Sequence, residues 1–79
     1  MGRIDLAIHY HEADGGEDQA LTLARRLFAH FDEAIDSLAL LPIDEEDFAL
    51  YLNGRLVHSQ RQSGRAPLVA DVWAALRDG

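Results

Sequence analysis

The first hydrophobic pattern in the chain has a period of two. In the stretch RIDLAIHY, apolar side chains alternate with polar or small ones, as in a half-buried strand. One face carries Ile4, Leu6, Ile8 and Tyr10, and the other carries Asp5, Ala7 and His9. A strand is therefore predicted over residues 3–10.

The period then lengthens to that of a helix. In EDQALTLARRLFAHF the apolar residues recur at spacings of three and four: Ala20, Leu21, Ala24, Leu27, Phe28 and Phe31. Acidic residues occupy the first turn, and Arg25, Arg26 and His30 lie toward the end, which complements a helix dipole. An amphipathic helix is predicted from Glu17 to Phe31.

Two further patterns of alternation follow this helix. AIDSLALL predicts a second strand, ended by Pro42 because proline cannot donate to a sheet ladder. After the acidic loop IDEED, the stretch FALYLNGRLVHS holds two strands around Asn53-Gly54, a pair that favours a tight two-residue hairpin turn. That turn predicts the cross-strand pairs Leu52–Arg55, Tyr51–Leu56, Leu50–Val57 and Ala49–His58.

The chain closes with a helical pattern after the loop QRQSGRA. Pro67 suits a first helical position, and an apolar stripe follows as far as Gly79: Leu68, Val69, Val72, Trp73 and Leu76. A right-handed crossover would make the first two strands parallel. The order β-α-β-β-β-α thus predicts one α/β domain over residues 1–79, a reduced thioredoxin-like fold with a four-stranded mixed sheet and two helices on one face.

Composition narrows the functions available to such a domain. The net charge is −7, and the seven basic residues, all arginine, form no patch, so neither nucleic acid nor an anionic membrane is expected as a partner. The longest apolar stretch, LALLPI, is too short to span a membrane, and the start lacks signal-peptide features, so we expect a cytoplasmic protein. The absence of cysteine removes disulfides, thiol nucleophiles and thiolate metal ligands.

Several stretches resemble the selenoprotein W-like (Rdx) family, whose members are short thioredoxin-fold chains. The family's Tyr-Cys-x-x-Cys motif, at the end of the first strand, lies over the residues from Tyr10 to Asp14, and FALYLNGRLVHSQRQSG and LVADVWAAL resemble its hairpin and final helix. The resemblance implies that His11 replaces the first cysteine, or selenocysteine, and that Asp14 replaces the second. Disulfide exchange needs a thiolate and a second sulfur, so thiol oxidoreductase activity is excluded.

The altered turn leaves two readings of its residues. Asp14 is predicted to cap the following helix. The alternative is a metal-binding or histidine-dependent activity over residues 9–14, because His9 and His11 point to one side of the strand with the carboxylates of Glu12 and Asp14 nearby. We prefer the first reading, and no catalytic residue or cofactor is predicted.

Binding is the function that the predicted fold leaves open. If both helices cover one face of the sheet, the opposite face has a partly apolar surface: Ala7, His9, Ala49, Tyr51, Leu56 and His58. We therefore expect a redox-inactive, non-enzymatic domain that acts as a protein-interaction or regulatory module. Its partner would be another protein or a second copy of the chain, held through the open face or an edge strand.

Overall fold

The chain folds into seven regular elements and two short 3-10 turns. The computed structural model describes residues 3–78, apart from the side chain of Asp14. The elements are β1 (Ile4–His11), η1 (Ala13–Gly15), α1 (Gly16–Phe31), η2 (Asp32–Ala34), β2 (Ile35–Ile43), β3 (Phe48–Leu52), β4 (Arg55–Ser59), α2 (Gln60–Ser63) and α3 (Val69–Asp78). The predicted element order is confirmed, and the short helix α2 occupies part of a predicted loop. The predicted end at Gly79 lies outside the described residues.

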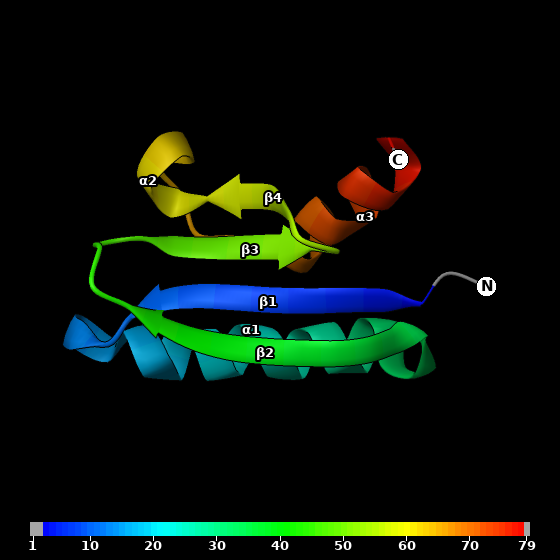
Figure 1. The fold of residues 1–79 in the computed structure, drawn as a ribbon, viewed down its shortest axis with the longest axis horizontal. Helices are drawn as coiled ribbons and strands as arrows, with labels where there is room; N and C mark the ends of the chain where they lie inside the picture. Colours follow the sequence, from blue (N-terminus) through cyan, green and yellow to red (C-terminus); the bar gives the residue numbers. More distant parts are fainter. Residues whose placement is uncertain (1–2, 79) are drawn as a thin grey trace.

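The four strands form one mixed sheet in the order β2-β1-β3-β4. β1 pairs with β2 in parallel and with β3 antiparallel, and β3 pairs with β4 antiparallel. Figure 1 shows α1 behind the half of the sheet that holds β1 and β2, whereas α3 lies near β4. The predicted α/β fold class, with a four-stranded mixed sheet, is confirmed.

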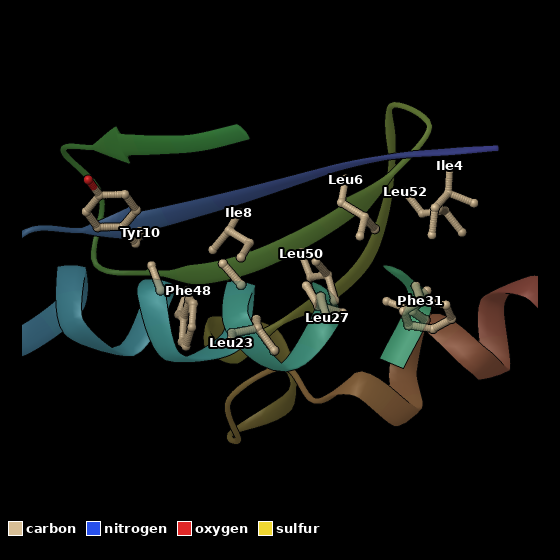
Figure 2. Packing of buried hydrophobic residues seen from close by; sticks show 13 residues of the cluster. Ile4, Leu6, Ile8, Tyr10, Leu23, Leu27, Phe31, Phe48, Leu50 and Leu52 are labelled. Carbon is tan, nitrogen blue, oxygen red and sulfur yellow. The ribbon is translucent and has the colours of Figure 1, made fainter. Parts of the chain in front are cut away.

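The hydrophobic core lies between the sheet and its helices. Alternate residues of β1 meet the apolar stripe of α1, as Figure 2 shows for Ile8 above Leu23 and Leu27. Helix α3 adds the fully buried Val72, and the rings of Phe31 and Trp73 lie 4.8 Å apart between their centroids. Burying these side chains is the main force that holds the helices on this face.

The hairpin differs from the predicted register halfway along β4. Its turn forms at Asn53 and Gly54, with φ angles of 52° and 83°. The pairs Leu52–Arg55 and Tyr51–Leu56 are confirmed, but a β-bulge then pairs Leu50 with His58 and Ala49 with Ser59. The predicted pairs Leu50–Val57 and Ala49–His58 are therefore wrong, because the bulge inserts one extra residue in β4.

Two predicted element ends also move, each around a proline. Pro42 lies inside β2, where a missing donor is tolerated because β2 is an edge strand. Helix α3 begins at Val69, two residues after Pro67. The carboxylate of Asp71 accepts a hydrogen bond from the backbone N–H of Leu68 at 2.7 Å, which ties down the start of this helix.

Candidate functional site

The turn between β1 and α1 is held by glycine backbone. Gly15 occupies the N-cap position of α1 with a φ of 79°, and no side-chain hydrogen bond caps the helix. The predicted cap by Asp14 is wrong as to position, because α1 starts one residue later than such a cap requires. The side chain of Asp14 lies outside what the structure describes.

Gly16 lets the helix start directly against the end of β1. A Cβ atom at this position would overlap the carbonyl group of His11. The first turn of α1 thus packs directly against the end of β1, where the sequence resembles a redox motif. The Gly15-Gly16 pair in the sequence was the signal for this close approach.

A hollow of about 390 Å³ opens beside this turn. It is bounded by the ends of β1, α1 and β3 and by α2, through Tyr10, His11, Ala13, Gly16, Gln19, Glu46, Asp47, Phe48, Gln60 and Arg61. Burial raises the pKa of Tyr10, and the charges of Glu17 and Glu12 raise it further, so its phenol stays protonated at neutral pH. The hollow presents hydroxyl, amide and charged groups, and no sulfur.

The two histidines of this region lie in different surroundings. The ring of His9 packs against the ring of Tyr51, with centroids 4.4 Å apart, on the face of the sheet without helices. His11 borders the hollow at the turn. Within the part of the chain that the structure describes, no three histidine, aspartate or glutamate side chains are placed to share a metal ion.

A dense polar network lies instead at the connection from β4 to α3. Asp47 accepts hydrogen bonds from the Ser59 hydroxyl at 2.9 Å and from the backbone N–H groups of Phe48 and Arg61 at 2.8 and 3.0 Å. Burial alone would raise the pKa of Asp47, but these hydrogen bonds lower it overall. Ser59 is buried, so the network fixes the end of β4 against the loop after β2.

His58 joins the two ends of this connection, in an arrangement we call the His58 clasp (His58, Ser63, Arg65 and Asp71). Its Nε2 lies 2.7 Å from the Ser63 hydroxyl and 3.0 Å from the Arg65 carbonyl oxygen. Its Nδ1 lies 3.8 Å from Asp71, whose carboxylate also binds the Arg65 guanidinium at 2.7 and 3.1 Å. The clasp was missed at the sequence level because only the bulge in β4 turns His58 toward α3.

The clasp includes serine, histidine and aspartate, and the roles of its histidine nitrogens depend on which one carries hydrogen. A carbonyl oxygen only accepts, so the contact with Arg65 is a hydrogen bond when Nε2 carries hydrogen, and Nε2 is then no base for Ser63. Asp71 is engaged by Arg65 and the Leu68 N–H rather than by Nδ1. The contacts of this arrangement link β4 to α3.

The face of the sheet opposite the helices carries an exposed apolar row. Ala7, His9, Tyr51 and Leu56 lie on this face, as their register requires, but His58 points to the other side, and Ala49 is only 2% exposed. Placing His58 on this face was wrong, and Ala49 is too buried to contact a partner. The prediction missed Leu41, which lies beside His9 and is 43% exposed. We name Leu41, His9, Tyr51 and Leu56 the open-face stripe; it crosses all four strands.

Comparisons with known proteins agree with this architecture. A profile of the Rdx family matches residues 5–78. A selenoprotein W-related protein from Vibrio cholerae is similar in structure, with a TM-score of 0.83, 23% identity, and coverage of 98% of this chain and 96% of the other. A protein from Bordetella parapertussis has a TM-score of 0.82 and 22% identity over 96% of each chain. A search of curated proteins gave no match.

Membrane insertion by a helix finds no support in the structure. Within residues 3–78, no helix has both the length and the apolar character needed to span a bilayer.

Proposed function

Because the chain belongs to the Rdx family and has no cysteine, we propose that it is a redox-inactive Rdx domain that binds a protein partner through the open-face stripe. A thiolate and a second sulfur are both needed for disulfide exchange, and the turn offers His11 and Asp14 in their place. The function of this domain is then recognition, directed to a surface away from the turn.

The observation that carries the proposal is the exposed row of large side chains on the open face. Leu41 and Leu56 are 43% and 44% exposed at its two ends, and the half-buried, tilted rings of His9 and Tyr51 lie between them. Aromatic residues are enriched among the residues that dominate binding energies, and their rigid rings lose little entropy on contact. A partner with a flat, mainly apolar surface fits this stripe.

Site-specific photo-crosslinking in the cells that produce the protein tests this proposal. A photoreactive phenylalanine analogue at position 56 should give one defined protein adduct, whereas the same analogue at Gln62, an exposed position of α2, should not. Adding Tyr51→Glu to the chain should abolish the adduct, because a buried unpaired carboxylate is costly. His11→Ala should leave it unchanged.

The outcomes separate the stripe from the turn. An adduct that persists with Tyr51→Glu, or that disappears with His11→Ala while the protein remains folded by circular dichroism, contradicts binding through the open face. Equal adducts at positions 56 and 62 contradict it as well.

A further inference from the structure

The two edges of the sheet are very different. β4 has five residues, carries a bulge at its middle, and is contacted by both α2 and α3, whereas the one irregularity of β2 lies near its start, at Asp36. β2 has nine residues, and among residues 3–78 no strand pairs with its outer edge (Figure 1). Its single ionisable side chain is Asp36. Natural edges are usually short, bulged, charged, covered or interrupted by proline, whereas the stretch from Ser37 to Leu41 is regular and uncharged and offers a place for another strand.

An apolar flank of α1 runs along this same edge. At about 100° per residue, Leu21 and Phe28 lie about 100° to 120° around the helix from the fully buried Leu27, both on one side. Gln19 lies about 80° away on the other side, and it lines the hollow with Phe48 and Gln60, so that side faces β3. Leu21 and Phe28 therefore face outward past β2, where they are 37% and 49% exposed.

We propose that the β2 edge, flanked by Leu21 and Phe28, is a homodimer interface in which the β2 strands of two copies pair antiparallel. The free backbone groups of this edge need a strand as partner, and β2 of a second copy has the same length and few charges. The two sheets then continue into a single sheet of eight strands. This interface shares only Leu41 with the open-face stripe, whose other residues stay free for a different protein.

The sequence of β2 suits a two-fold axis at Ala39. Antiparallel pairing about this residue sets Leu38 opposite Leu40, and Ser37 opposite Leu41, of the other copy. Asp36, at the irregularity of β2, and Pro42, which lacks an N–H group, both lie outside this stretch, so neither enters the pairing from Ser37 to Leu41. No like charges meet within the paired residues.

The same axis brings the two helical flanks together. β2 extends for about 26 Å and α1 for about 24 Å, antiparallel to each other, so an axis through the middle of β2 passes near the middle of α1. Leu21 of one copy then lies within about one helical turn of Phe28 of the other. The same two-fold axis therefore buries both the sheet edge and the helix flank in the dimer.

Sedimentation equilibrium of the intact chain tests this dimer. We expect a dimer whose dissociation constant falls as salt rises, because two copies of charge −7 repel each other. Phe28→Glu should raise the dissociation constant by about tenfold or more, since it places a carboxylate in the joint apolar flank. Leu56→Glu, at a residue of similar exposure on the open face, is the matched control and should have little effect.

A single-cysteine variant tests the geometry independently of these charges. The chain has no cysteine, so Ala39→Cys introduces the only thiol, and mild oxidation should link two copies at the axis. Ala70→Cys, exposed on α3, is the control and should remain largely unlinked.

Several results would overturn the proposal. A monomer at concentrations on the order of 1 mM in high salt contradicts it, and so does equal cross-linking of the two cysteine variants. A dimer that Leu56→Glu dissociates and Phe28→Glu leaves intact would use the open face instead. Loss of the dimer without loss of the position-56 adduct would leave the proposed function standing.

Discussion

The two strand-to-helix connections of this domain are built in opposite ways. Between β1 and α1, the chain turns through Gly15 and Gly16, and the N-cap residue of the helix is a glycine. Between β4 and α3, the side chains of Asp47, His58 and Asp71 make most of the contacts that hold the connection. The turn that resembles a redox motif depends on backbone, whereas the other connection depends on polar side chains.

This difference shows where substitutions are tolerated. A connection held by glycine geometry places little demand on the side chain at position 11, so we expect the fold to accept substitutions of His11. A connection held by shared hydrogen bonds depends on each partner, because a buried group left unpaired costs free energy. The predictions below perturb each connection in turn.

The largest effect is expected at Gly16. Gly16→Ala puts a methyl group into the carbonyl of His11, backbone that cannot rotate away, so α1 must shift from β1. We expect the free energy of unfolding to fall by about 3 kcal/mol, measured by urea denaturation.

Gly15→Ala is the control for that experiment. Position 15 has open space for a methyl group. The cost of Gly15→Ala is therefore the strain of the left-handed φ of 79°, which should lower the free energy of unfolding by about 1 kcal/mol. Equal losses for the two variants would show that turn conformation, and not the close approach to His11, stabilises this connection.

The sequence predicted most of the fold because its signals are local and repeated. Period-two and helical patterns located each strand and both long helices, and Asn53-Gly54 located the hairpin turn. The bulge in β4 has no such signal, because it depends on what packs against Val57 and His58 in three dimensions. One inserted residue moved His58 from the predicted binding face into the clasp.

The candidate site was harder to predict for the same reason. Ala7, His9, Tyr51 and Leu56 follow from strand alternation and lie on the open face. Leu41 lies in the predicted second strand but was missed, because the pattern along the chain does not give the parallel register that pairs Leu41 with His9. The network around Asp47 joins residues from three segments, a combination that spacing along the chain does not reveal.

A smaller effect is expected at Asp47, and it depends on pH. Asp47→Asn keeps an acceptor but removes the charge that strengthens three hydrogen bonds, so we expect a loss of about 1 to 2 kcal/mol at pH 7. Since the pKa of Asp47 is lowered in the folded state, its contribution is complete above the unfolded value of about 3.9 and is lost as the pH falls below it.

Urea denaturation at pH 7 and at pH 3 measures this dependence. The difference between wild type and Asp47→Asn should narrow at pH 3, where wild-type Asp47 also begins to be protonated. Both proteins should still lose stability in acid as Asp71 becomes protonated, because the hydrogen bonds from Arg65 lower the pKa of Asp71 in the folded state too. A constant difference between the two pH values would rule out the charge of Asp47 as the cause.

The smallest effects come from a matched pair of histidines, one from each connection. His58→Gln removes ring contacts to Ser63 and Arg65 that a glutamine amide only partly replaces, and should cost about 1 kcal/mol. His11→Gln should change the stability by less than about 0.5 kcal/mol, since among the described side chains none forms a hydrogen bond with the ring of His11. Thermal unfolding of both variants at one pH gives the comparison. If His11→Gln proved as costly as His58→Gln, the β1–α1 turn would depend on the side chain of His11. Glycine geometry would then not be enough to hold this connection.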